Sequence, residues 1–329
     1  MGILKEIRRK IYSFYRQKIV CEQFPMLTVL SKKEWLEKDA IGIVYTLHHI
    51  ADKNPNGIPT NEDLKVSPGF LETIILKYKR KGFRFISLDQ LSDIIITGKR
   101  PEHPFIAFTI DDGYLDNYTQ ALPVFERQQV PFTIFVATDF IDKRSILWWD
   151  ILEDLILKND SVIFGGETYR CQSFQGKWDV FRILREKILL FDQTKIEKEL
   201  KEAFSYYDID WYEPVRRQAM SWEQVKDISQ HPLCTIGGHT VSHLALNKLS
   251  DQEFREEIAD GVAKLKSVIG KPIQHFAYPY GSPNEIGERE YQLISEFNFK
   301  TVLTAYGGCI TESNMHQITH LPRVYLHER

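Results

Sequence analysis

Short apolar runs alternate with helical patterns through most of the chain. Seven runs predict buried strands, at residues 41–47, 83–88, 105–110, 131–137, 233–237, 273–278 and 300–304. Helices are predicted over 70–81, 118–128, 250–270 and 291–297. The third of these begins with a capping box from Ser250 to Glu253 and ends at Gly270.

Strands that alternate with helices favour parallel pairing, with the helices outside the sheet. We therefore expect an α/β fold, a variant β/α barrel that is irregular and seven-stranded. Residues 142–220 break the alternation, and a helical insertion with loops is expected there. Polar residues follow directly after several strands, at the face where such barrels place their active sites.

Composition excludes several classes of protein. The chain has 329 residues, of which 43% are hydrophobic and 26% charged, which is typical of a globular protein. No apolar run reaches 18 residues, so no membrane-spanning helix is expected. The net charge of −3 argues against a nucleic-acid partner. Four scattered cysteines without a CxxC pair, and no apolar signal-peptide core, predict a cytoplasmic protein.

The first 22 residues differ from the rest, and we treat residues 23–329 as the barrel domain. Residues 1–20 contain six basic residues and one acidic residue, and their apolar residues recur at helical spacing. This pattern predicts a basic amphipathic helix. It either contacts an anionic membrane, at the inner membrane face, or packs on the domain with its basic side in solvent.

Three short segments carry candidate chemistry. Asp111 and Asp112 end an apolar strand, so one carboxylate can bind a cation while the other stays free as a base; alone, Asp-Asp-Gly is typical of a turn. His239 and His243 follow Gly237-Gly238 and are four residues apart, close enough to bind one metal ion, although such pairs also arise by chance.

The third segment is the aromatic strand that ends in Pro279-Tyr280-Gly281. A rigid turn of this kind can hold a backbone N–H toward a developing oxyanion, or it can simply end the strand. Trp148 and Trp149 either stack on sugar rings or cover the barrel.

In this order, the three segments resemble the polysaccharide deacetylase family, also called the NodB-homology or carbohydrate esterase family 4. The family's first motif, T-F-D-D-G, is similar to Thr109-Ile110-Asp111-Asp112-Gly113, and its second, H-[ST]-x-x-H, is matched in full by residues 239–243. The third motif often has an arginine where this chain has Ala277. The resemblance covers about residues 40–325 and implies the family's β/α barrel.

The N-terminal segment resembles the poly-N-acetylglucosamine deacetylase branch. There, a strand ending in Tyr-His supplies the general acid. Residues 44–50 look similar, with His48 in that position, although Leu47 replaces the tyrosine. His49 is the competitor for this role or an orienting residue, and His327 is a third candidate.

The resemblance also implies a ligand set and roles for the remaining residues. Asp112, His239 and His243 would bind one divalent metal ion, with zinc first and nickel, cobalt or iron as alternatives. Asp111 would be the general base, and the N–H of Tyr280, held by Pro279, would share the oxyanion with the metal. Arg323, from another strand end, would replace the missing arginine, unless it is a surface residue.

The resulting hypothesis is a metal-dependent hydrolase that removes an acetyl or formyl group from an amino sugar, in surface-polysaccharide or glycolipid biosynthesis. The substrate would be a sugar nucleotide, a lipid-linked saccharide or a glycan. Two alternatives stay open. One is a non-catalytic carbohydrate-binding protein on the same barrel, and the other is a hydrolase of a non-sugar amide.

Overall fold

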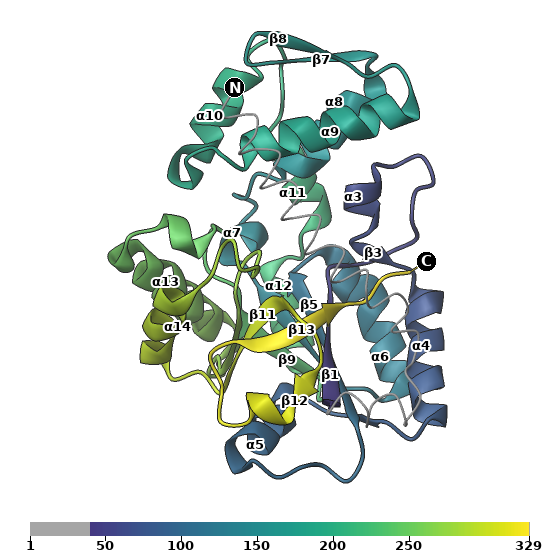
Figure 1. Cartoon of the computed structure of the whole chain (residues 1–329), viewed down its shortest axis with the longest axis vertical. Helices are drawn as coiled ribbons and strands as arrows, with labels where there is room; N and C mark the ends of the chain where they lie inside the picture. Colours follow the sequence, from purple (N-terminus) through teal and green to yellow (C-terminus); the bar gives the residue numbers. More distant parts are fainter. Residues whose placement is uncertain (1–39, 329) are drawn as a thin grey trace. The chain divides into compact units, whose positions relative to one another are not determined.

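Seven parallel strands close into a barrel in the computed structural model, which describes residues 40–328 (Figure 1). The helix predicted within residues 1–22 lies outside the described residues. Strand β1 closes the barrel because it pairs with both β5 and β13. The expected seven-stranded β/α barrel is confirmed. In order around the barrel, the strands are β1 (Ala40–Leu47), β5 (Phe105–Asp112), β6 (Phe132–Val136), β9 (Cys234–Gly238), β10 (His275–Ala277), β11 (Thr301–Gly307) and β13 (Leu321–Tyr325).

One of the seven strands differs from the sequence prediction. The run at 83–88 forms only β4 (Arg84–Phe85), which pairs with the start of β5 outside the closed barrel. The seventh barrel strand is instead β13, where Pro322 and Arg323 interrupt the apolar pattern. Three further short strands lie beside the barrel: β12 (Ile310–Thr311), antiparallel to β1, and the pair β2 (His49–Ile50) and β3 (Lys65–Val66).

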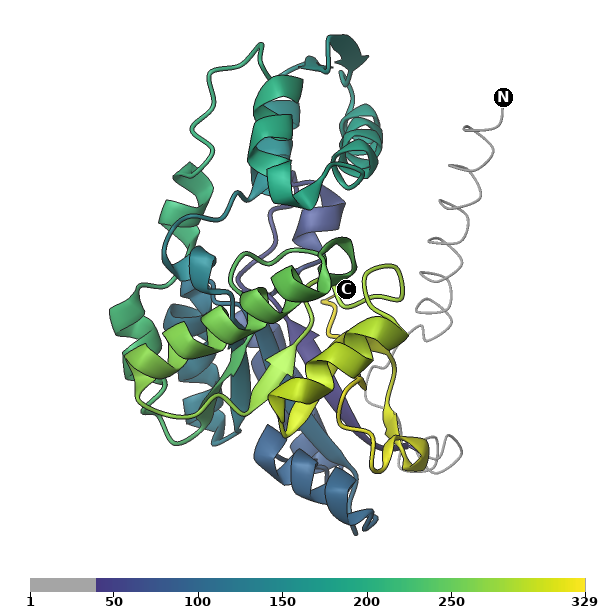
Figure 2. The same ribbon diagram turned by 90° about the vertical axis from the view of Figure 1, so that its left-hand side faces the viewer.

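Helices surround the barrel in both views (Figures 1 and 2). The predicted capping box and Gly270 terminus of the longest helix are both present. The helical elements of this layer are α4 (Pro68–Arg80), α5 (Leu88–Thr97), the π-helix η1 (Asn117–Ala121), α6 (Leu122–Gln128), α7 (Thr138–Ile141), α12 (Trp222–Ile228), η3 (Leu246–Lys248), α13 (Asp251–Ile269), α14 (Glu288–Ile294), η4 (Ser295–Phe297) and η5 (Glu312–Asn314). The short helix α3 (Pro59–Glu62) instead bonds to residues 149–153, through the side chain of Asn61. None of the helices described is both long and apolar enough to span a membrane.

An insertion between β6 and α12 forms a second layer beyond one end of the barrel (Figure 1). It has a hydrophobic cluster of its own, which includes Leu152, Phe181 and Phe204. A β-hairpin accompanies the expected helices. The elements are α8 (Trp148–Lys158), β7 (Ser161–Phe164), β8 (Glu167–Arg170), α9 (Phe174–Ile188), η2 (Gln193–Lys195), α10 (Ile196–Ala203) and α11 (Glu213–Gln218).

Apolar side chains from several strands form a buried cluster in the barrel, among them Val44, Phe135 and Leu303. Toward the carboxyl ends of the strands the buried residues become polar, and they include Thr46 and Asp111. Burying polar groups is unfavourable unless they are paired. The bonding partners of these buried polar groups therefore indicate which ligands this end of the barrel can bind.

Candidate metal centre and active site

The two adjacent aspartates turn in different directions because of the backbone at the end of β5. Asp112 has a φ of 77° and Gly113 a φ of 100°. The left-handed region is unfavourable for a residue with a side chain and tends to occur at functional sites. As a result the Asp111 carboxylate bonds to Arg323, whereas the Asp112 carboxylate faces two histidines.

Asp112, His239 and His243 converge on one point. Nε2 of His239 lies 3.4 Å from Oδ1 of Asp112, and Nε2 of His243 lies 3.3 Å from the same atom. One ligand atom from each residue lies within 4.8 Å of the other two. Three sequence positions up to 131 residues apart thus supply one carboxylate and two imidazoles to a single small volume.

This donor set fits a divalent cation. Oδ1 of Asp112 is buried and has no hydrogen-bond partner among the described residues. Nδ1 of His239 donates to the carbonyl of Ala277 at 2.7 Å, so in the neutral ring Nε2 carries the lone pair that faces Asp112. Burial lowers the pKa of His243 to about 4, which keeps this imidazole neutral and able to bind a metal at neutral pH. Three protein ligands with open positions are typical of a catalytic zinc site.

Arg323 forms a buried, two-pronged ion pair with Asp111. Its Nη1 donates to Oδ1 at 2.7 Å and its Nη2 to Oδ2 at 2.8 Å, and Arg323 is 1% exposed. Arg323 also donates to the carbonyl of Thr304 and to the hydroxyl of Thr109. Burial alone raises the pKa of Asp111, but the charges of Arg323 and the nearby histidines outweigh it and hold that pKa below its usual range. The alternative of a surface arginine is wrong.

The structure separates the three histidines that were candidates for the general acid. His48 lies beside both carboxylates, which favour its charged form, but burial is the larger effect and lowers its pKa. Its Nδ1 is buried without a partner in the described part of the chain, and its ring stacks on Tyr325 at 5.8 Å. His49 instead bonds to Asp116 at 2.6 Å, and the exposed His327 faces the carbonyl of Asp63.

Tyr280 lies beside the cluster, on the turn that follows β10. Its ring centre is 5.0 Å from that of His243, and burial raises the pKa of its hydroxyl to about 12. Tyr280 and Gly281 both have positive φ, 57° and 56°. A Cβ at Gly281 would lie 2.6 Å from the backbone nitrogen of Ala305, so the tight turn after Pro279 requires glycine there.

The sequence analysis missed Tyr325, which packs against the site. Burial is the main cause of its raised pKa, and the nearby charges of Asp111 and Asp112 raise it further. The two-residue period of a strand could have predicted this position, because Tyr325 and Arg323 lie on the same face of β13. Thr46, paired in register with Thr109 of β5, was also missed, and it donates to Asp111.

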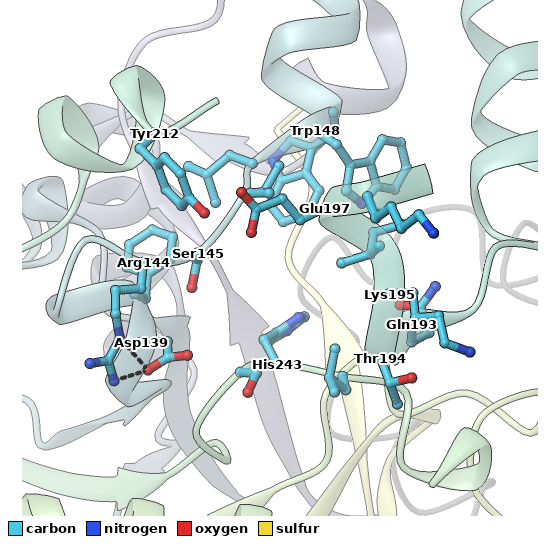
Figure 3. A pocket seen from close by; sticks show the side chains of 18 of the residues that line it. Asp139, Arg144, Ser145, Trp148, Gln193, Thr194, Lys195, Glu197, Tyr212 and His243 are labelled. Atoms are coloured by element: carbon cyan, nitrogen blue, oxygen red, sulfur yellow. Dashed lines mark hydrogen bonds and ion pairs between the residues drawn. The ribbon is translucent and has the colours of Figure 1, made fainter. Parts of the chain in front are cut away.

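A cavity of about 870 Å³ lies over the candidate metal centre. Asp112, His243 and Tyr280 of the barrel line this cavity together with residues of the insertion. Figure 3 shows Trp148, Glu197 and Tyr212 across the cavity from His243. Trp149 also lines this space, and Trp148 belongs to the hydrophobic core of the insertion as well. The charged residues of the lining are Arg144, Lys195, Lys198, Lys201, Asp112, Asp139, Glu197 and Glu202.

The fold and the site together define a class of protein, a closed β/α barrel with a candidate single-metal centre at the carboxyl ends of its strands. The sequence model of the family described as polysaccharide deacetylase matches residues 98–300, more than half of the chain. The chain belongs to the polysaccharide deacetylase family.

Individual relatives are distant. The chain is 20% identical over 249 residues to YxkH of Bacillus subtilis (strain 168), which carries the family's name; the match covers 76% of the chain and 60% of YxkH. Among solved structures, the deacetylase PplD of Streptococcus pyogenes is 17% identical with a TM-score of 0.58, and IcaB of Ammonifex degensii is 19% identical with a TM-score of 0.57. Each of these two matches covers 87% of this chain and 92% of the other. At this identity the similarity shows the shared fold.

Proposed function

We propose that the protein hydrolyses the N-acyl group, acetyl or formyl, of an amino sugar and uses one divalent metal ion to do so. The observation that carries this proposal is that two adjacent carboxylates have different partners. Asp112 joins two imidazoles in a set that fits a cation, and Asp111 stays apart, held ionised by Arg323.

A divalent cation, with zinc first and nickel, cobalt or iron as alternatives, would be held by Asp112, His239 and His243, and would supply Lewis-acid polarisation of the acyl carbonyl and of water. Asp111 would accept the proton of the attacking water, whose oxygen adds to the acyl carbon. The N–H of Tyr280, on its rigid turn, would donate to the oxygen that becomes negatively charged.

His48 in its charged form, which the two neighbouring carboxylates favour, would donate a proton to the sugar nitrogen as the C–N bond breaks, because an amine is a poor leaving group without that proton. The products are a carboxylate and a free amino sugar. The position of His48 beside both carboxylates supports it as the general acid over His49 and His327, which are bonded elsewhere. Arg323 would orient Asp111 and keep it ionised, in place of the arginine missing at Ala277.

The lining of the cavity supports a saccharide chain over a sugar nucleotide. Four of its residues are basic and four are acidic, so the cavity has no excess of positive charge to bind a diphosphate. The indole rings of Trp148 and Trp149 and the hydroxyl of Tyr212 are groups that suit a hydroxyl-rich ring. A glycan, free or lipid-linked, is therefore the substrate we propose, within surface-polysaccharide or glycolipid biosynthesis.

The basic segment 1–20 supports a further part of the proposal, that the protein works in the cytoplasm at the inner membrane face. Deleting these residues should release the protein from anionic phospholipid vesicles in a sedimentation assay, and neutral vesicles serve as the control. Equal binding by the full and the shortened chain would refute this part.

The first test is the metal content of untagged protein, measured by elemental mass spectrometry after incubation with zinc. We expect about one zinc ion per wild-type chain and none in a His239→Ala, His243→Ala double variant. Wild type should then release acetate from N-acetylglucosamine oligomers, whereas Asp111→Asn should keep the zinc and lose turnover. Wild type that binds no metal, or an Asp111→Asn variant that turns over normally, would contradict the mechanism.

A further inference from the structure

One glutamate on helix α13 holds the loop that carries both candidate histidine ligands. Oε2 of Glu257 accepts hydrogen bonds from the N–H groups of Val241 and Ser242, at 3.0 Å and 2.9 Å. Its Oε1 accepts from the hydroxyl of Ser242 at 2.6 Å. All three groups lie between His239 and His243, so one side chain fixes the middle of the metal-binding segment.

The loop needs such support because its backbone is unusual. Thr240 and His243 have positive φ angles of 66° and 58°, a conformation that side-chain-bearing residues rarely adopt. Within the loop, the N–H of His243 donates to the hydroxyl of Thr240 at 3.0 Å. From the other side, the N–H groups of Thr138 and Asp139 donate to the carbonyls of Thr240 and Val241.

Helix α13 also packs directly against the loop at a glycine. A Cβ at Gly261 would lie 3.0 Å from the carbonyl carbon and oxygen of Thr240. Glycine inside a helix is unfavourable relative to alanine, and the close approach to Thr240 explains its presence in α13. Gly261 lies four residues after Glu257, on the same face of the helix. Two positions on one face of α13, Glu257 and Gly261, therefore contact the loop.

We propose that Glu257 is a positioning residue for the metal centre, and that its hydrogen bonds hold His239 and His243 with both Nε2 atoms toward Asp112. This inference rests on the proposed metal-dependent function. Partners that orient metal ligands typically change metal affinity by about 10–100-fold when they are removed. Glu257 would act through the loop backbone rather than through a ligand side chain.

Four variants separate this role from a general effect on folding. Glu257→Ala removes all three bonds, and Glu257→Asp keeps the charge but shortens the side chain by one methylene. Glu257→Gln preserves the geometry, because its amide oxygen can accept from both N–H groups and its NH₂ can donate to the Ser242 hydroxyl. Glu256→Ala is the matched control, because Glu256 is exposed on the same helix and bonds to Gln252.

The measurement is the zinc dissociation constant of each full-length variant, by competition with a chromophoric chelator, together with the visible spectrum of the cobalt-loaded protein. We expect affinity to fall at least about tenfold in the Ala and Asp variants and the cobalt spectrum to change. Glu257→Gln and Glu256→Ala should stay close to wild type in both. The Asp variant keeps the inference testable if Glu257→Ala does not fold.

Wild-type zinc affinity in both the Ala and the Asp variants would overturn the inference, whatever their thermal stability. A Gln variant as weak as the Ala variant would overturn it as well, because the charge rather than the hydrogen-bond geometry would then carry the effect. Wild type that binds no zinc would refute the metal centre itself, a result distinct from the first two.

Discussion

Replacing Arg323 with methionine should destabilise the protein strongly, through Asp111. The substitution keeps an unbranched side chain in the barrel but leaves the Asp111 carboxylate buried, at 3% exposure, without its partner. Removing one member of a buried ion pair costs more than the pair contributes, because the remaining charge stays desolvated. The metal-free protein, kept in chelator, is the form to study, so that no bound cation compensates for the loss.

The size of the effect follows from the contacts. Arg323 makes two bonds to the carboxylate, at 2.7 and 2.8 Å, and bonds to charged groups contribute about 1.5–3 kcal/mol each. Breaking a buried pair from one side costs about 3–5 kcal/mol in other proteins. Both estimates give a loss of about 4 kcal/mol in the free energy of unfolding. At about 2 °C per kcal/mol for a domain of this size, Tm should fall by about 8 °C.

A double-mutant cycle tests the reasoning. We would measure urea unfolding by circular dichroism for wild type, Arg323→Met, Asp111→Leu and the double variant. The double variant has no unpaired charge. Its loss of unfolding free energy should therefore be at least about 2 kcal/mol smaller than the sum of the losses in the two single variants. Additive losses, or a loss below about 1 kcal/mol for Arg323→Met, would show that the pair is not coupled as its geometry implies.

Three further predictions concern other parts of the molecule. His48→Gln should retain zinc but lower kcat by about 10²–10⁴-fold on the oligosaccharide that wild type deacylates, and an unchanged kcat would assign the acid elsewhere. Removing the paired charges across the cavity, with Glu197→Gln and Lys201→Met, should raise KM about tenfold for an oligosaccharide but not for its monomer, whereas an equal rise for both would indicate a structural role. Burial lowers the pKa of His275 from 6.5 to about 4, so the unfolded chain takes up a proton first as pH falls. Between pH 7.5 and pH 5, wild type should therefore lose about 2 kcal/mol of unfolding free energy that a His275→Gln variant keeps, measured by urea unfolding, and parallel pH profiles would contradict this.

The motif residues could be found from the sequence because each lies at the end of a strand or soon after one. Asp111 and Asp112 end one apolar run and His239 follows another, and the carboxyl ends of parallel strands meet at one end of a barrel. The structure brings these residues together with His243. Arg323 lies at the same end of the barrel, although its strand, β13, has no apolar run from which the strand could be predicted.

The remaining parts of the site depend on contacts that the sequence does not encode locally. A polar helix face has the same sequence pattern whether it faces bulk water or a cavity. The sequence therefore did not identify Glu197 and Lys201 of α10 as residues of the cavity. Glu257 likewise looks like one more charged position on a surface helix. Only the packing of α13 on the loop, through Gly261, shows that its carboxylate faces inward rather than toward solvent.

The separate hydrophobic core of the insertion has a consequence for how this protein can change. Leu200 and Phe204 fix α10 to that core, while Glu197, Lys201 and Ser205 line the cavity. Exchanging these polar residues should cost little stability, because none of them belongs to the hydrophobic core of the insertion. Substrate preference can therefore drift, or be redirected by a small mutant library on a single helix, while the barrel and its chemistry stay constant.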